Sequence, residues 1–156
     1  MIVSYRIIHA LCLWSVSQAS LNYESPTAQQ KYWKHQAPEA QKTCKEISYR
    51  GYAAGLNILE LISVSYVETR HTKNLVSPAG ARGPLQALPR YWKRKGDKDH
   101  ITSGLRAWKY YREKSTSLRE AAGKYNGSGP NGQYARDIQA HYDELKKLYA
   151  LLRWPL

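Results

Sequence analysis

The chain has 156 residues, a length that suits one domain built around one hydrophobic core. It carries 24 Lys and Arg against 12 Asp and Glu, and the net charge of +12 indicates attraction to a polyanion such as nucleic acid, an anionic membrane or a bacterial cell wall. No helix-turn-helix, zinc-finger or single-strand-binding pattern accompanies this charge, so the sequence argues against specific nucleic-acid binding.

Residues 1–19 have the pattern of a secretory signal peptide. Arg6 supplies a positive charge, residues 7–16 are apolar, and Ser17 and Ala19 are small residues at the two positions that a signal peptidase reads. The apolar run is too short for a stable membrane span. We favour an export signal, and the alternative is a buried first helix or an uncleaved anchor.

The two cysteines are Cys12, inside this segment, and Cys44. Removal of residues 1–19 would leave Cys44 alone, so we predict no internal disulfide. Cys44 has no nearby His in the sequence, which argues against a catalytic thiol. The five histidines form no spaced pair, and we expect neither a metal site nor a cofactor.

Residues 20–49 predict a helical extension, with a short helix over 27–36 and a second helix from Pro38 to Arg50 that ends at Gly51. Residues 52–67 predict the next helix. This helix is apolar on most of its faces, so we expect it to be the central, buried helix of the domain.

Residues 69–84 are rich in Gly and Pro and predict a loop with at most very short strands. Further helices are expected over 85–95, after a cap region at 97–100, and over 117–125. Residues 126–132 form an evident loop, and helical spacing from Tyr134 onward predicts the last helix. The sequence therefore predicts a mainly α fold, a helical bundle around a central buried helix, with one irregular hairpin-like region.

Glu68 is the main candidate for a functional residue, because it ends the buried helix and precedes the glycine-rich loop. A carboxylate in this position lies partly in a low dielectric, which favours its protonated form and suits a general acid. Glu60 is a fallback in the middle of the helix. Asp97 and Asp99 are candidates for a second carboxylate, but both stand where a helix N-cap is expected. The lack of a convincing partner favours a mechanism with one carboxylate.

Three segments resemble the soluble-lytic-transglycosylase (SLT) domain of the lysozyme-like superfamily, over roughly residues 50–145. The first is Glu68 with the run Ser-Pro-Ala-Gly-Ala-Arg-Gly-Pro-Leu-Gln at 77–86. The second is residues 97–104, and the third is Lys-Tyr-Asn-Gly-Ser-Gly-Pro at 124–130, followed by Tyr134 and Ile138. The resemblance implies an α+β lysozyme-like domain over residues 50–156.

The resemblance also implies an activity, which is cleavage of the β-1,4 bond between N-acetylmuramic acid and N-acetylglucosamine in peptidoglycan. In that family one glutamate performs both proton transfers, and the muramoyl 6-hydroxyl attacks to give a 1,6-anhydro product. Glu68 matches the glutamate. The residues that match substrate-binding positions are Thr69, Ser77, Gly83, Gln86, Tyr125 and Asn126.

The chain departs from the family pattern at a few positions. Thr69 replaces the usual Ser but keeps the hydroxyl, and His71 replaces an aromatic residue. Pro84 and Leu85 stand before Gln86 where the family has Leu and Met, and Lys124 replaces a small residue. None of these changes removes the acid.

The sequence thus predicts an exported or virion-carried lytic transglycosylase whose partner is the glycan strand of peptidoglycan. A phage lysin and a wall-opening enzyme of a secretion machine both fit its size and charge. The alternative is a catalytically weak glycan-binding or structural component of a phage particle or secretion apparatus. A protein that binds nucleic acid through its charge is a third, weaker hypothesis.

Overall fold

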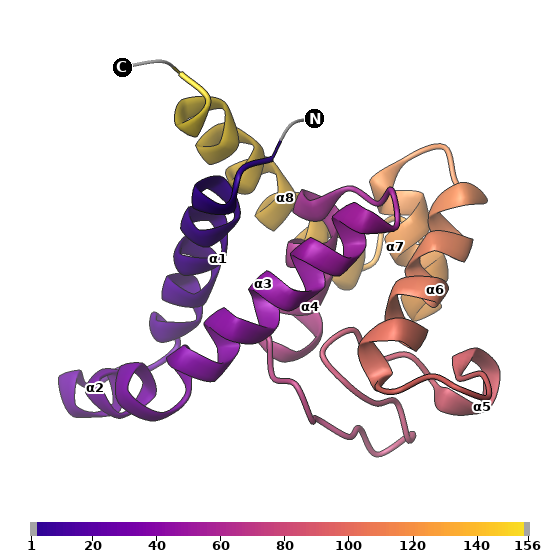
Figure 1. Cartoon of the computed structure of the whole chain (residues 1–156), viewed down its shortest axis with the longest axis horizontal. Helices are drawn as coiled ribbons and strands as arrows, with labels where there is room; N and C mark the ends of the chain where they lie inside the picture. The colour runs from indigo at the N-terminus through magenta and orange to yellow at the C-terminus, as the bar shows by residue number, and fades with distance from the viewer. Residues whose placement is uncertain (1–2, 155–156) are drawn as a thin grey trace.

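The computed structural model describes residues 3–154, and eight helices make up most of that part of the chain (Figure 1). In chain order they are α1 (Tyr5–Ser20), α2 (Pro26–His35), α3 (Ala37–Ala53), α4 (Ile58–Thr69), α5 (Pro89–Trp92), α6 (His100–Glu113), α7 (Leu118–Asn126) and α8 (Gln133–Leu152). The mainly α prediction is confirmed. Extended structure in the described residues is limited to isolated antiparallel bridges, which pair Arg82 with Val76 and with Ala87.

Helix α4 is the central helix, as the sequence predicts, and it packs against α1, α3 and α8. It begins at Ile58 rather than at residue 52, because the chain first turns at Gly55 with a φ of 75°. The side chain of Asn57 then caps the helix by accepting hydrogen bonds from the backbone N–H groups of Leu59 and Glu60. Residues 58–65 are all buried, so α4 forms the axis of the fold.

Gly51 does not end the preceding helix as predicted, since α3 continues to Ala53. A Cβ atom at position 51 would lie 2.0 Å from Cδ1 of Leu61, which means that this glycine lets α3 approach α4 closely. The predicted helix over 85–95 is also wrong in extent. Only Pro89–Trp92 is helical, because Gln86 has a left-handed backbone with a φ of 51° in the bridged loop.

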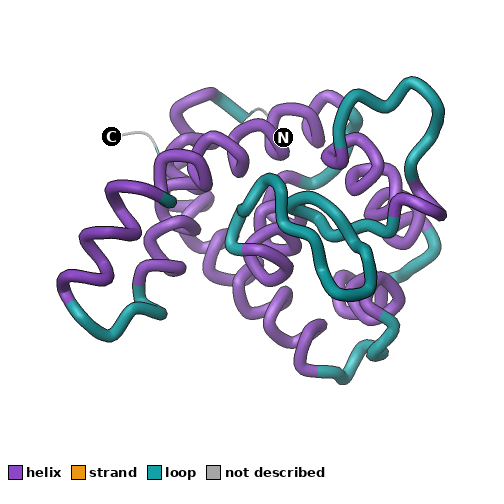
Figure 2. Tube along the Cα trace, turned by 90° about the horizontal axis from the view of Figure 1, so that it is seen from below, coloured by secondary structure: helices purple, strands orange, loops and turns teal. Residues whose placement is uncertain are grey.

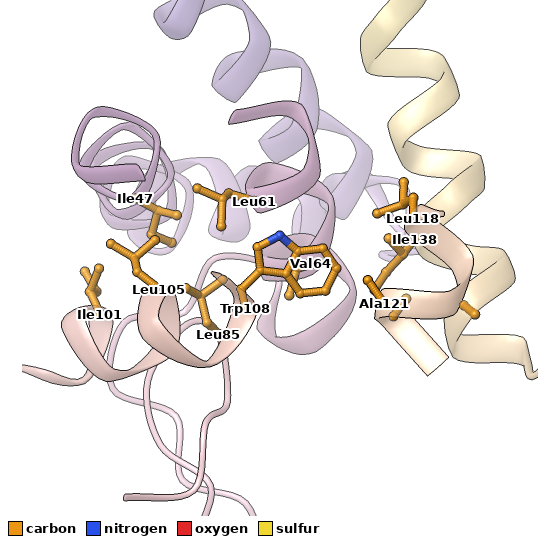
Figure 3. Packing of buried hydrophobic residues seen from close by; sticks show 12 residues of the cluster. Ile47, Leu61, Val64, Leu85, Ile101, Leu105, Trp108, Leu118, Ala121 and Ile138 are labelled. Atoms are coloured by element: carbon orange, nitrogen blue, oxygen red, sulfur yellow. The ribbon is translucent and has the colours of Figure 1, made fainter. Parts of the chain in front are cut away.

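The largest core cluster lies between α3, α4, α6, α7 and α8 around the indole of Trp108, which is fully buried (Figure 3). A second cluster joins α1, α3, α4 and α8 and includes Ile8, Leu11 and Ile62. The long loop between α4 and α5 crosses one side of the helices, as seen from below in Figure 2. No helix within residues 3–154 has the length and apolar character needed to cross a bilayer.

The N-terminal segment is part of this fold. Helix α1 buries Ile8, Leu11 and Val16, and Cys12 forms a disulfide with Cys44 of α3. The prediction of an unpaired Cys44 is therefore wrong, because it assumed that residues 1–19 are absent. This geometry corresponds to the alternative of a buried first helix, while export of the protein stays a prediction.

Candidate active site

Glu68 lies in the last turn of α4, where it faces α8. The hydroxyl of Tyr134 donates a hydrogen bond to Oε1 of Glu68 at 2.6 Å. Burial raises the pKa of Glu68 from its ordinary value of 4.5 to about 7, and the hydrogen bond from Tyr134 acts in the opposite direction. No ion pair within residues 3–154 involves Glu68. The carboxyl group therefore keeps its proton close to neutral pH.

A second phenol lies near Glu68. Tyr125, at the end of α7, donates its hydroxyl to the backbone carbonyl of Leu85. Burial raises the pKa of the Tyr125 phenol well above 10, and the charge of Glu68 adds to the increase. The same two causes, in the same order, raise the pKa of Tyr134. The Glu68 carboxyl group thus has one neutral phenol as its hydrogen-bond partner and a second one nearby, and neither offers it a compensating positive charge.

Thr69 connects the end of α4 to the loop. Its hydroxyl lies 3.0 Å from the carbonyl oxygen of Pro84 and 3.2 Å from that of Ser65. The side chain is buried, with 7% of the residue exposed. Thr69 therefore fixes the loop next to Glu68 and does not present its hydroxyl to a ligand, in contrast to the role that the resemblance implies.

Gln86 is also engaged with the loop. Its side-chain Nε2 donates to the carbonyl oxygens of Gly83 at 2.8 Å and Leu75 at 3.0 Å. Because both hydrogens of the amide nitrogen are used in this way, the Oε1 atom is the part of Gln86 that can receive a hydrogen bond from a ligand.

Ser77 and Gly83 shape the loop. The Ser77 side chain accepts a hydrogen bond from the backbone N–H of Ala81 at 3.0 Å, which closes a turn. Gly83 has a φ of 80°, and a Cβ atom there would lie 2.8 Å from Cβ of His100. Only glycine accommodates both that backbone conformation and the contact with α6.

A small hollow lies next to Tyr125. It is lined by Gln86 and by four aromatic residues, and its volume is about 160 Å³. The aromatic residues are Tyr91, Trp92, Tyr111 and Tyr125. Amphipathic rings with one convergent polar group are typical of sites for wet, polar ligands. Four larger hollows exist among the described residues, and none of them is lined by Gln86. Glu68 lines neither these hollows nor the one next to Tyr125.

Asn126 is the predicted site residue that the structure separates from the others. It is exposed at the C-terminal end of α7, next to Gly127, whose φ of 82° ends the helix. Tyr125 points its hydroxyl toward the loop, whereas Asn126 forms no side-chain hydrogen bond within the described residues. The structure therefore groups Glu68, Tyr125 and Gln86, with Thr69, Ser77 and Gly83 supporting the loop beside them.

The alternative carboxylates have structural partners. Asp99 caps α6 by accepting from the backbone N–H of Thr102 at 3.0 Å, as predicted, and Arg50 lowers its pKa to about 2. Asp97 does not cap a helix, contrary to expectation. It accepts a hydrogen bond from the backbone N–H of Arg94, and its ion pair with Arg106 holds its pKa well below the usual range.

Tyr134 is the residue at this site whose role sequence reasoning missed. The sequence places it on the last helix by spacing and in the third segment of the SLT resemblance, but it assigns this tyrosine no contact with Glu68. Its proximity to Glu68 depends on the packing of α8 against α4, which a single sequence does not reveal.

Comparison with known proteins adds no assignment, because no protein-family model, curated protein or solved structure matches the chain.

Proposed function

We propose that the protein is a peptidoglycan lytic transglycosylase in which Glu68 is the single acid and base. The observation that carries this proposal is a partly buried carboxyl group with a pKa near 7 that accepts a hydrogen bond from the phenol of Tyr134. An aromatic hollow lies at the neighbouring residues Tyr125 and Gln86. The net charge of +12 supports docking on an anionic cell envelope. The proposal includes delivery to the wall by export or within a virion.

The geometry of Glu68 assigns roles to its two oxygens. Tyr134 donates to Oε1, so the acidic proton of Glu68 resides on Oε2, and this oxygen is the one that serves the substrate. Protonation of the glycosidic oxygen by Oε2 allows the bond between that oxygen and the muramoyl C1 to break. The leaving N-acetylglucosamine then departs with a free hydroxyl.

The second half of the reaction returns the enzyme to its initial state. The muramoyl 6-hydroxyl forms a bond to C1 and transfers its proton to the Glu68 carboxylate. One bond to C1 breaks, another forms, and no water is consumed, which accounts for a site with one carboxylate. Asp97, Asp99 and Glu60 are each paired with an arginine, and none is available as a nucleophile.

The test is to incubate purified protein with peptidoglycan and to identify the new sugar ends by mass spectrometry. Anhydro ends are expected, and Glu68→Gln should reduce their formation by roughly 10³-fold because it removes the transferable proton. New reducing ends would identify a hydrolase instead. If wild type and Glu68→Gln both bind the wall and neither cleaves it, the protein is a glycan-binding component. Salt-sensitive DNA binding without wall affinity would contradict both.

A further inference from the structure

A buried polar cluster connects α1 to the helices of the site. The Oγ atom of Ser15 lies 2.8 Å from Nε2 of His71 and 2.8 Å from Nε2 of His141. His71 follows α4, and His141 belongs to α8, so three separate segments meet at one hydroxyl group. A hydroxyl has one hydrogen to donate and two lone pairs that accept, so Ser15 can donate to one imidazole at most, and at least one of the two rings carries its proton on Nε2.

Further contacts fix both imidazole rings. Nδ1 of His71 lies 2.9 Å from the hydroxyl of Ser65 on α4. The ring of His141 stacks on Tyr66 of α4, with centroids 4.0 Å apart and planes 8° from parallel. Trp14 of α1 contacts the same ring at 5.0 Å. The cluster is therefore a set of oriented contacts between α1, α4 and α8.

Both histidines have pKa values far below 7, so their rings are neutral at neutral pH. Burial lowers the pKa of each ring to about 3, and the nearby charge of Arg70 acts in the same direction. The cluster therefore provides fixed hydrogen bonds and does not act as a pH switch.

Two residues of the cluster flank Glu68 in the sequence. Ser65 precedes Glu68 by three residues, and His71 follows it by three. Between them the chain leaves α4 through two left-handed residues, Arg70 at a φ of 52° and His71 at 65°. Such a conformation is uncommon for residues other than glycine and persists where surrounding contacts impose it. The bonds of the His71 ring supply such contacts.

The cluster also reaches the partner of Glu68. Tyr134 and His141 are seven residues apart on α8, so they lie on the same face of that helix, two turns from each other. Tyr134 meets Glu68 at one end of this face, and His141 meets Ser15 at the other. A shift of α8 relative to α4 would therefore disturb both contacts together.

We infer that Ser15 is a positioning residue for the proposed reaction: through His71 and His141 it holds α4 and α8 in the relation that places Tyr134 against Glu68. The inference rests on the proposed function for its kinetic consequences. It also means that α1 helps to position the residues of the proposed active site. The Cys12–Cys44 disulfide, one helical turn before Ser15, attaches this helix to α3.

The experiment compares Ser15→Ala with Ser20→Ala. Both serines are buried on α1, but the Ser20 hydroxyl only donates to the carbonyl of Ser17. For each full-length protein we would measure kcat and KM on soluble glycan strands, the pKa of the Glu68 carboxyl by NMR, and Tm. Ser15→Ala should lower kcat roughly tenfold with little change in KM, because a small misplacement of the acid affects the chemical step.

The pKa of Glu68 provides the readout that a loss of stability alone would not change. A loosened contact between α4 and α8 admits water, so the Glu68 pKa should fall from about 7 toward 4.5, and the alkaline limb of the rate profile should move to lower pH. Ser20→Ala should leave kcat and this pKa as in wild type. A Ser15→Ala protein with wild-type kcat and wild-type Glu68 pKa would overturn the inference.

A second variant covers the case in which Ser15→Ala does not fold. Ser65→Ala removes the other hydrogen bond of the His71 ring from within α4 and should lower kcat and the Glu68 pKa in the same direction. A wild-type result for it would then refute the inference. The two proposals can fail separately. If the wild-type protein does not cleave the wall, the proposed function is wrong. The shift of the Glu68 pKa between wild type and Ser15→Ala, measured by NMR, still decides the role of Ser15.

Discussion

The two ends of α4 carry the same residue type in opposite electrostatic settings. Glu60, in the first turn, is 5% exposed and accepts hydrogen bonds from Nε of Arg112 at 3.0 and 3.2 Å. Glu68, in the last turn, has the neutral phenol of Tyr134 as its hydrogen-bond partner. The helix dipole adds to the contrast, because it favours negative charge at the N-terminal end and disfavours it at the C-terminal end.

This comparison shows that burial alone does not determine whether a carboxyl group keeps its proton. The guanidinium of Arg112 compensates the charge of Glu60, so that this carboxylate joins α4 to α6. Glu68 has no such cation, and its proton compensates it instead. The partner of a buried carboxyl group therefore decides whether it supports the structure or is available for proton transfer.

The largest effect on stability is expected at the Glu60 end. Arg112→Met leaves a buried carboxylate without its cation and should lower the free energy of unfolding by roughly 3–4 kcal/mol. Lys109→Met on the same helix is the control, because its ion pair with Glu113 is exposed and spans 3.8 Å. Chemical denaturation measures both. Wall cleavage per folded molecule should be unchanged in Arg112→Met, and a loss there would mean that the two ends of α4 are not independent.

A pH-dependent effect on stability is expected at the Glu68 end of α4. Because the folded-state pKa is about 7 and the ordinary value is 4.5, this group stabilises the fold fully below pH 4.5, and the contribution is lost as the pH rises through 7. Glu68→Gln removes the cost of a buried charge, so it should be more stable relative to wild type at pH 8.5 than at pH 4.5, by roughly 2–3 kcal/mol.

Thermal unfolding of wild type and Glu68→Gln across this pH range measures the difference. A constant difference in stability from pH 4.5 to pH 8.5 would show that the Glu68 carboxyl has an ordinary pKa, and the assignment of a general acid would lose its physical basis.

The smallest expected effect is that of removing the Tyr134 hydroxyl. Tyr134→Phe removes the donor to Oε1 of Glu68 and should reduce kcat roughly tenfold, or about 1.4 kcal/mol. The hydrogen bond lowers the pKa of Glu68, so its loss should raise that pKa further and move the alkaline limb of the rate profile to higher pH. Tyr149→Phe is the control on the same helix, because the buried Tyr149 hydroxyl has no hydrogen-bond partner within residues 3–154. Equal rate profiles for the two variants would contradict the role of Tyr134.

The sequence predicted those features that local patterns determine. The run of apolar residues predicted a buried central helix, and its junction with a glycine-rich loop predicted the position of Glu68 and of the loop residues Ser77 and Gly83. The start of α4 was missed because Tyr52 to Leu56 continue the apolar character of the helix, and only the turn at Gly55 separates them from it.

Features that depend on packing between distant segments were not predictable. The contact of Tyr134 with Glu68 joins residues 66 positions apart, and that of Ser15 with His141 joins residues 126 apart. The disulfide was missed for another reason. The pattern of an apolar segment near a positive charge favoured a removable signal peptide, but it also fits a buried helix. The packing of this segment against α3, α4 and α8 is not visible in the pattern itself.

The Cys12–Cys44 bridge has a consequence for the fate of the N-terminal segment. The bridge joins residues on opposite sides of the bond after Ala19, where the signal-peptide pattern places cleavage. If oxidation precedes proteolysis, a cut at that bond yields two polypeptides that remain linked through sulfur, and α1 leaves the molecule only after reduction. The order of the two events would then decide whether the mature product contains one chain or two.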